Sequence, residues 1–324
     1  MKPKRSNPLF AGFFRRNYLT AAVVVSLAGA SSIQSVSAGT LYWDTNGATA
    51  GSGNAAGNWD SGTNWTTDSS GASATVGWTD GESAVFSAGT DGIGAYTVTL
   101  AGSVTTPSIL IEEAGAKTIA GGTINIGAGS INTAAAGNGN AFTISSLIAG
   151  AGGLTINANG DTSETGGGVG GMLILSGANT ISGDITINSG VVRSNSGFGG
   201  SGNKLILNGG GIVDANLNTN IANNIEIPAT KTGVYRAYGS VATGQLSGAI
   251  TGSGTLMRTD GGTVTLNCNF SAFTGTFRNA QGTTVIGTPA ATTMAAIPVV
   301  QSDGGNVLRL GAAGNGHVER GHRP

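Results

Sequence analysis

The feature that most constrains the fold is a series of very short apolar strands separated by glycine-rich turns. From about residue 106 onward, segments of three or four residues alternate Ile, Leu or Val with Thr or Asn, and Gly follows closely. A strand this short cannot bury an apolar face alone, so it must stack on copies of itself. The segments lie at residues 109–111, 123–126, 154–157, 172–175, 185–188, 205–207, 225–227 and 264–267.

Two longer blocks repeat the same skeleton. Residues 173–190 (LILSGANTISGDITINSG) and 264–282 (VTLNCNFSAFTGTFRNAQG) both show a strand, an Asn-containing turn, Ser/Thr-Gly, a second strand and Gly. Each block follows a similar turn, IAGAGGL at 148–154 and ITGSGTL at 250–256. Glycine permits positive φ in such turns, and Asn tolerates it next best. The spacing therefore indicates one structural unit used repeatedly.

This skeleton resembles the autotransporter-associated β-strand repeat family, with its Leu-x-Leu-x-Gly-x-Asn-Thr-x-x-Gly-x-Thr-x-Ile-x-x-Gly run. Residues 173–190 carry the run nearly intact, whereas the second block has Cys268 in place of the first Gly and Asn269-Phe270 in place of Asn-Thr. The Trp/Asn/Gly-rich stretch that begins near residue 40 is also similar, so the resemblance covers most of 40–310. It implies a right-handed parallel β-helix exported to the cell surface.

Physical reasoning from the short strands predicts the same all-β architecture. Coils of ~20–25 residues stacked at ~4.8 Å would give roughly nine coils, and a length of roughly 45 Å, for about 200 residues. Ile, Leu and Val would face inward, while Thr, Asn and Ser would stay solvated. A β-sandwich is the alternative fold, and it requires longer strands at 8–12-residue spacing.

Residues 1–38 predict an export signal. A basic start is followed by an apolar stretch from Leu19 to Ala30, and Val36-Ser37-Ala38 offers small residues before a cut at Gly39. The apolar stretch is shorter than the ~20 residues of a membrane span, so we expect no membrane span in the mature chain. We expect a secreted or cell-surface protein, associated with the outer membrane if it is part of a longer autotransporter.

The last eight residues, 317–324, switch abruptly to His, Arg and Glu. We expect either a truncated or frame-shifted end or a disordered polar tail. Autotransporter passengers of this kind continue into a C-terminal membrane barrel, and no Trp, Tyr or Phe follows Phe277 to supply its aromatic girdles. The chain is therefore expected to be a fragment, or else freely secreted or anchored otherwise.

Charge and cysteine content exclude several functions. Without residues 1–38 the chain has 10 basic and 16 acidic residues, and the basic ones are scattered. Nucleic-acid binding, which needs clustered Lys and Arg, is therefore not expected. Cys268 is the single cysteine, and both histidines, His317 and His322, lie at the very end. We expect Cys268 to be a small buried side chain rather than a nucleophile.

Residues 39–105 form a compositionally distinct region, which we expect to cap the repeat solenoid of residues 106–316. It holds a period-two strand at 95–100, with Tyr96, Val98 and Leu100 on one face. It also contains all four tryptophans, which either form the core of the cap or stack on sugars. These candidate glycan-binding residues are Trp43, Trp59, Trp65 and Trp78.

Carboxylates are the residues that a polysaccharide-cleaving β-helix would need in groups. Asp161 and Glu164 are the nearest spaced pair, while Glu112 and Glu113 are adjacent and would point to opposite faces of a strand. The other carboxylates are each solitary and pair with no Lys or Arg in a recurring pattern, so we interpret them as isolated surface charges. They are Asp184, Asp214, Glu226 and Asp260.

Calcium-binding motifs do not match this chain. Asp44-x-Asn46 begins like an EF-hand loop, but Ala48 fills the fifth position and Gly47 comes too early. The Gly-Gly-x-Gly-x-Asp nonapeptide of Ca²⁺-binding repeats is missing as well. No metal or cofactor site is therefore expected from the motifs.

The sequence thus predicts an exported, non-enzymatic β-solenoid with a structural or adhesive role, and surface glycans or other cell-surface components are its expected partners. The alternatives are a secreted β-helix polysaccharide lyase or hydrolase, or a glycan-binding module.

Overall fold

The strands form because apolar and polar residues alternate with a period of two. In β11 (Leu154–Asn157), Leu154 and Ile156 are buried whereas Thr155 and Asn157 are half-buried. The computed structural model describes residues 38–134, 141–163, 171–195, 197–200, 202–215, 220–238, 243–287 and 299–310. The predicted tail at 317–324, and all of the predicted signal except Ala38, lie outside these residues.

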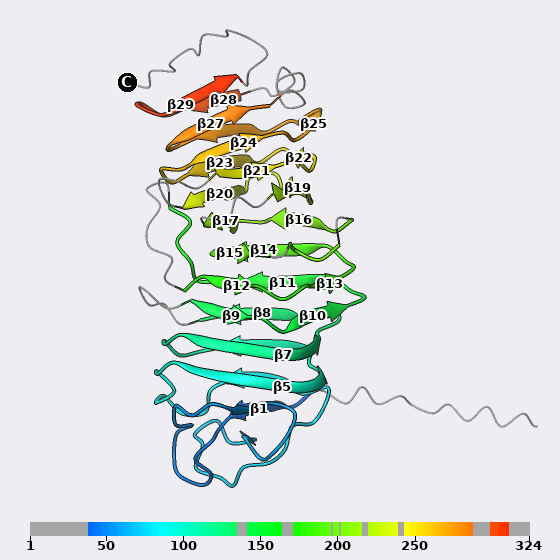
Figure 1. Cartoon of the computed structure of the whole chain (residues 1–324), viewed down its shortest axis with the longest axis vertical. Coiled ribbons are helices and arrows are strands. Elements are labelled where there is room, and N and C mark those ends of the chain that lie inside the picture. Colours follow the sequence, from blue (N-terminus) through cyan, green and yellow to red (C-terminus); the bar gives the residue numbers. More distant parts are fainter. Residues whose placement is uncertain are drawn as a thin grey trace, which may run out of the picture. The chain divides into compact units, whose positions relative to one another are not determined.

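Consecutive coils stack in register as parallel strands. Ile131 pairs with Ile156, Ile156 with Ile187, and Ile187 with Leu207, so one inward position is repeated along the stack. The result is an all-β parallel solenoid of about 8 turns, with no helix in the described part. The predicted fold is confirmed, and the β-sandwich alternative is excluded because neighbouring strands of the coils run parallel (Figure 1).

The strands are arranged in three sheets, here called sheets A, B and C. In sheet A the spatial order is β3 (Trp65–Thr66), β1 (Thr40–Trp43), β4 (Ser83–Phe86), β6 (Ser108–Ile111), β8 (Ser130–Thr133), β11, β14 (Ile185–Ser189), β16 (Lys204–Leu207), β19 (Asn224–Ile227), β22 (Ile250–Gly252) and β25 (Ala272–Phe273).

Sheet B runs through β13 (Thr180–Ile181), β10 (Leu147–Gly150), β7 (Lys117–Asn125), β9 (Phe142–Ile144), β12 (Leu173–Leu175), β15 (Val191–Ser194), β17 (Gly211–Ala215), β20 (Thr232–Tyr238), β23 (Thr255–Thr259), β26 (Thr276–Asn279) and β28 (Val299–Ser302), with β5 (Tyr96–Thr105) beside β7 and β2 (Gly57–Asn58) beside β5. Sheet C holds β18 (Asn220–Ile221), β21 (Thr243–Leu246), β24 (Thr263–Leu266), β27 (Thr283–Ile286) and β29 (Val307–Leu310).

Two long strands, β5 and β7, bend partway along their length. Their register shifts between Leu100 and Ser103, and Gly121 and Gly122 both have positive φ at the bend of β7. A side-chain carbon at Gly121 would lie 2.5 Å from the carbonyl oxygen of Leu100, so glycine is required there. Beyond this bend β7 pairs with β10 instead of β9, and one strand therefore serves two faces of the coil.

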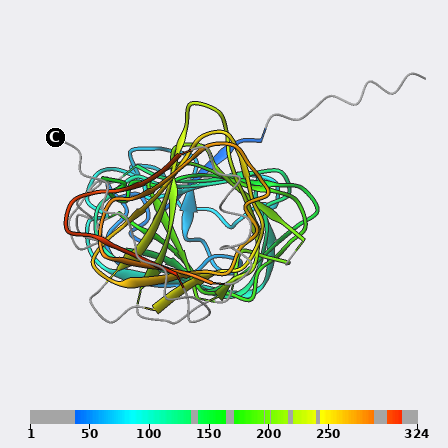
Figure 2. The same ribbon diagram turned by 90° about the horizontal axis from the view of Figure 1, so that it is seen from above.

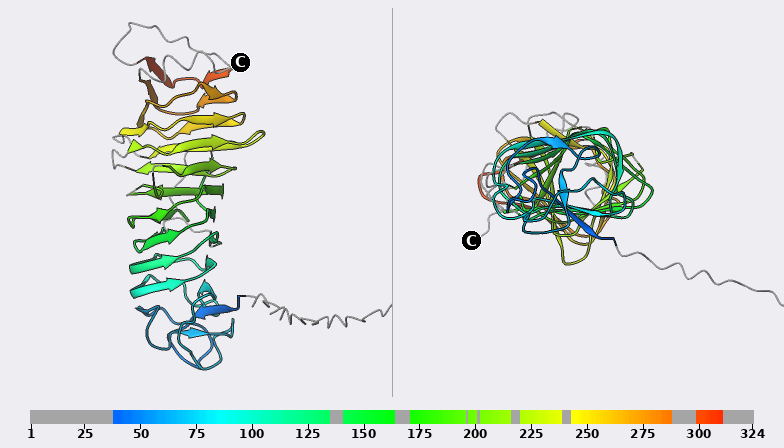
Figure 3. Two further views of the ribbon diagram at one scale, coloured as in Figure 1. Left: turned by 90° about the vertical axis from the view of Figure 1, so that its right-hand side faces the viewer. Right: turned by 90° about the horizontal axis from the view of Figure 1, so that it is seen from below.

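Most of the core is one apolar cluster that extends from Leu41 to Ile286, and two small clusters lie around Val191 and Val234. Viewed along the stacking direction, the coloured ribbon of the described residues winds around a closed outline (Figure 2). The inward side chains of its strands are the buried residues of the apolar cluster. Seen from the side, successive coils lie one above another (Figure 3). The outward positions of the same strands are mostly Thr, Asn and Ser, as predicted.

A ladder of asparagines follows the end of the strands in sheet A. The Asn157 amide donates to Asn132 Oδ1 at 2.5 Å, Asn188 to Asn157 at 3.1 Å, and Asn208 to Asn188 at 2.8 Å. These side chains are half-buried, so each hydrogen bond ties one coil to the next where the chain leaves the sheet.

The region predicted as a cap, residues 39–105, contains the first strands of the solenoid as well. β1 pairs antiparallel with β3 but parallel with β4, and β5 pairs with β7 beyond the predicted boundary. The described residues from Ala38 onward belong to a single compact unit for this reason. The period-two strand is confirmed, since Tyr96, Val98 and Leu100 are all buried in β5.

Candidate functional site

Three of the four tryptophans form the centre of an aromatic cluster at the β1 end of sheet A. The Trp65 ring centroid lies 5.3 Å from Trp43, 5.2 Å from Trp59 and 4.8 Å from Trp78. Phe86 packs 5.4 Å from Trp65, and the Trp65 indole N–H donates to the carbonyl oxygen of Trp59 at 2.9 Å. These rings are brought together because β1 lies between β3 and β4.

The burial of this cluster corrects the glycan-stacking hypothesis for three of its members. Trp43, Trp59 and Trp65 are each 0 % exposed, so none presents a ring face to a sugar. Trp78 is half-buried, and its indole N–H donates to Asp80 Oδ1 at 3.0 Å. The other interpretation, that the tryptophans form the core of the cap, fits their positions.

Glu112 and Glu113 differ in exposure, and only Glu113 has an inward partner. Glu113 Oε2 accepts a hydrogen bond from Ser87 Oγ at 2.6 Å, and burial raises the pKa of Glu113. The buried Lys117 ammonium donates to the carbonyl oxygens of Glu113 and Ala114 at 3.1 and 2.6 Å. Its burial lowers the pKa of Lys117 to about 8.

Two carboxylates interpreted as isolated charges share a lysine across coils. Lys204 Nζ lies 2.6 Å from Glu226 Oε2 and 3.7 Å from Asp184 Oδ2. The hydrogen bond to Glu226 raises the pKa of Lys204. The sequence interpretation was wrong here because the three residues belong to successive coils, and stacking rather than sequence distance brings them together.

Asp260 is also paired, and its ion pair is buried. Arg236 Nε lies 2.8 Å from Asp260 Oδ2, and both side chains are almost completely shielded from solvent. Arg236 also donates to the carbonyl oxygen of Asp161 at 2.7 Å. Arg258, in the next strand of sheet B, donates to the carbonyl oxygens of Asp260, Gln281 and Gly262, and burial lowers its pKa to about 10. Asp260 is therefore a structural charge rather than an isolated surface charge.

The remaining candidates supply no reactive group in the described part of the chain. Cys268 is fully buried, and burial raises the pKa of its thiol to about 12. Glu164, the side chain of Asp214, and His317 and His322 lie outside what the structure describes. No group of three or more His, Cys, Asp and Glu side chains gathers in a metal-binding arrangement among the described residues.

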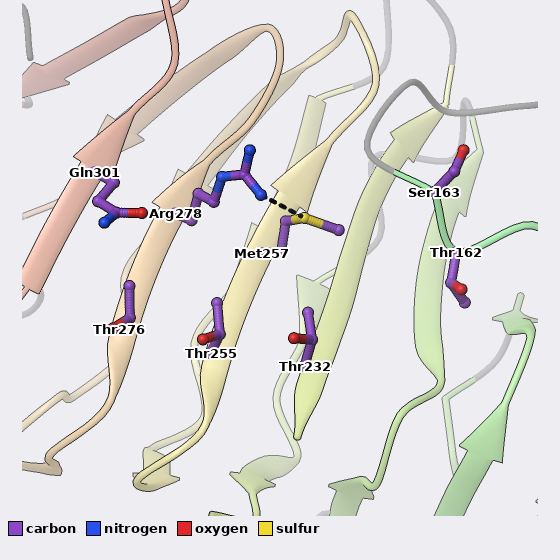
Figure 4. A pocket seen from close by; sticks show the side chains of 8 residues that line it. All are labelled: Thr162, Ser163, Thr232, Thr255, Met257, Thr276, Arg278 and Gln301. Atoms are coloured by element: carbon purple, nitrogen blue, oxygen red, sulfur yellow. Dashed lines mark hydrogen bonds between the residues drawn. The ribbon is translucent and has the colours of Figure 1, made fainter. Parts of the chain in front are cut away.

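The outward face of sheet B carries two ladders that the sequence analysis did not single out. Thr232 pairs with Thr255 and Thr255 with Thr276, which places three hydroxyl-bearing side chains in one row. Two positions further along the strands, Met257 pairs with Arg278, and Arg278 with Gln301 (Figure 4). The signal in the sequence is that Thr255 and Thr276 occupy equivalent positions of their strands. Aligning the strands at these residues would have revealed this face.

These two ladders line a recess of about 520 Å³. Thr162 and Ser163, which precede β12, complete its lining beside β20 (Figure 4). The Arg278 guanidinium is fixed by Asp303 Oδ2 at 2.6 Å and lies 3.9 Å from the sulfur of Met257. Hydroxyl, amide and guanidinium groups can hydrogen-bond a polar ligand, but the recess lining contains no carboxylate to act as an acid or base.

No helix of the described residues is long and apolar enough to cross a membrane. No protein-family profile matches the chain, and no curated protein and no solved structure matches it either.

Proposed function

We propose that this protein is an exported, non-enzymatic β-solenoid that acts as a structural or adhesive element at or beyond the cell surface. The observation that carries the proposal is the stack of paired parallel coils, whose main apolar cluster extends from Leu41 to Ile286. Such a stack presents the same outward positions at every coil, which suits repeated weak contacts with an extended surface. The signal-like residues 1–38 and the repeat resemblance of residues 173–190 support export.

The recess on sheet B is the contact surface that we propose, and a surface glycan is the partner. Sugar hydroxyls both donate and accept hydrogen bonds, as do the hydroxyls of Thr232, Thr255 and Thr276. Gln301 and Arg278 add donors at the neighbouring positions. Binding through a few such groups in an open recess is expected to be weak for one site.

A polysaccharide lyase or hydrolase is the less favoured function. Glycoside cleavage normally uses two carboxyl groups about 5–10 Å apart around the substrate. Asp184 and Glu226 both contact Lys204, at 3.7 and 2.6 Å, so each carboxylate of this group already faces a cation rather than an open substrate site. Incubation of the full chain with pectin or alginate is expected to release no new reducing or unsaturated ends, and their appearance would contradict the non-enzymatic proposal.

The adhesive proposal is tested by glycan binding to the purified full chain. The double variant Thr255→Val and Thr276→Val removes two hydroxyls from the recess while it keeps the side-chain shape. Each lost hydrogen bond is worth about 0.5–1.5 kcal/mol, so we expect binding to weaken by about 10-fold. Thr186→Val, on the outward side of sheet A, is the matched control and should bind like the wild type. Equal binding by the double variant and the control would refute this surface.

A further inference from the structure

The first strand of the solenoid begins directly after two exposed residues. β1 starts at Thr40, and both Ala38 and Gly39 before it are exposed. The bond between Ala38 and Gly39 is the cut position that the small side chains of residues 36–38 predict. A protease that cuts this bond leaves the strand pairing intact, since the paired residues of β1 start at Thr40.

Parallel pairing places Gly39 beside Glu82. Thr40 of β1 pairs with Ser83 of β4, so the residues that precede them lie side by side at the same edge of sheet A. The backbone N–H of Ser83 donates to the carbonyl oxygen of Gly39 at 2.9 Å, which fixes Gly39 at this edge. This hydrogen bond uses the carbonyl side of Gly39, so it does not depend on the residue before the cut.

The carboxylate of Glu82 lies against the backbone of Gly39. A side-chain carbon added at Gly39 would overlap Glu82 Oε2 and would lie 3.2 Å from the carboxyl carbon. Because the nitrogen of a residue lies about 2.5 Å from its side-chain carbon, the Gly39 nitrogen is less than about 5 Å from Glu82 Oε2. A charged nitrogen at this position therefore needs only a small movement to form an ion pair with the carboxylate.

Glu82 has no partner of its own. It is half-buried, and its carboxylate takes part in no hydrogen bond or ion pair among the described residues. Asp80, the nearest acidic neighbour in sequence, already accepts hydrogen bonds from the indole N–H of Trp78 and the backbone N–H of Thr105 at 3.0 and 2.8 Å. A carboxylate that loses part of its water on folding is costly unless a donor or a cation replaces that water.

A recess of about 630 Å³ opens beside the same two residues. Gly39 and Glu82 both line it, and Tyr42 and Val76 lie on other parts of its wall. Glu82 is the only charged side chain of this lining, and Tyr42 is its only other titratable group. The recess gives a new chain end at Gly39 room to turn toward the carboxylate.

We propose that cleavage after Ala38 supplies the missing partner, because the α-ammonium group of Gly39 then forms an ion pair with the Glu82 carboxylate. This inference rests on the proposed export of the protein. An endopeptidase adds one water molecule across the amide bond, so that Ala38 gains a carboxylate and Gly39 gains an amine. The amine takes up a proton at neutral pH, since the ordinary pKa of an α-amino group is about 7.7–8.0. In the uncut chain the same nitrogen is an uncharged amide, so the ion pair forms only after processing.

Identification of the new N-terminus is the first test. The full chain would be produced in an exporting bacterial host, and the N-terminal peptide of the exported protein would be identified by mass spectrometry. We expect it to begin at Gly39. An exported chain that begins elsewhere would overturn the ion pair and leave the export proposal standing. A chain retained inside the cell with residues 1–38 attached would overturn both.

Reactivity of the Gly39 amine in the exported chain is the second test. Only the uncharged amine reacts with an acylating reagent, so labelling rates between pH 6 and 9 report its pKa. Glu82 should raise this pKa because it favours the charged amine. Since Gly39 is exposed, we expect the wild type to react about 2–5-fold more slowly at pH 7 than Glu82→Gln.

A matched control separates the ion pair from a general effect of charge. Glu112→Gln removes an exposed carboxylate that follows β6, at the opposite edge of sheet A, and should react like the wild type. Equal labelling rates for the wild type and Glu82→Gln, in a chain that begins at Gly39, would refute the ion pair without affecting the export proposal.

Discussion

Charged residues in this protein take their partners from neighbouring coils, so stacking decides whether a charge is buried or exposed. Asp260 has a positive φ of 72°, and its carboxylate meets Arg236 from the preceding coil. Asp184 also meets a cation, Lys204, but half of its side chain is exposed. The buried Arg236–Asp260 pair therefore has a structural role, whereas the Lys204–Asp184 pair stabilises the fold only weakly because solvent screens it.

This difference can be measured with one substitution at two positions. Asp260→Asn keeps a residue type that tolerates positive φ but removes the charge beside buried Arg236. We expect it to lower the free energy of unfolding by about 2–4 kcal/mol in urea denaturation. Asp184→Asn should change it by less than about 0.5 kcal/mol. Equal effects at the two sites would contradict a structural role for the buried pair.

At the scale of elements, the coils are joined by the asparagine ladder as well as by backbone pairing. Asn157 takes part in two of the ladder's hydrogen bonds, with Asn132 and Asn188, whereas Asn208 takes part in one. Because the ladder is half-buried, an amide that loses its partner is only partly rescued by water. Asparagines in the interior of the ladder should therefore contribute more to the free energy of unfolding than those at its ends.

Alanine substitution tests this ordering. Asn157→Ala breaks two hydrogen bonds and should lower the free energy of unfolding by about 1–3 kcal/mol. Asn208→Ala breaks one hydrogen bond and should lower it by about half as much. Urea denaturation of both variants, followed by circular dichroism, makes the comparison. A larger loss for Asn208→Ala would show that the ladder does not stabilise the stack in this way.

The same scale shows what could be predicted from sequence. The in–out pattern of β11 and the short strands were predictable because alternation is local, and stacking followed because so short a strand cannot bury its face alone. The register was not predictable, since the coils differ in length: Ile131 pairs with Ile156, but Ile156 pairs with Ile187.

The candidate sites depend on that register, so they were harder to predict from the sequence than the fold. The threonine row on sheet B, the Lys204 pairs and the Arg236–Asp260 pair all join residues of different coils. Tryptophan composition was visible in the sequence, but whether Trp59 faces water or the core depends on how the strands around β1 assemble.

At the scale of the whole described solenoid, parallel pairing of successive coils extends through sheets A, B and C, and only β1 and β3 pair antiparallel. Ser108 is linked to Thr251 in sheet A through Ser130, Thr155, Thr186, Ile206 and Glu226, with one step for each coil. At ~4.8 Å for each step, distances along this column grow in proportion to the number of coils. The proposed adhesive surface depends on this regular spacing.

Dipolar electron paramagnetic resonance tests that spacing most directly. Nitroxide labels would be placed on cysteines at Ser108 paired with Thr186, Glu226 or Thr251, in a Cys268→Ala background. Three, five and six steps predict backbone separations of roughly 14, 24 and 29 Å, to which label linkers add a similar offset in each pair. Distances that rise in this order and proportion would support the solenoid, whereas a shorter distance to Thr251 than to Thr186 would contradict it.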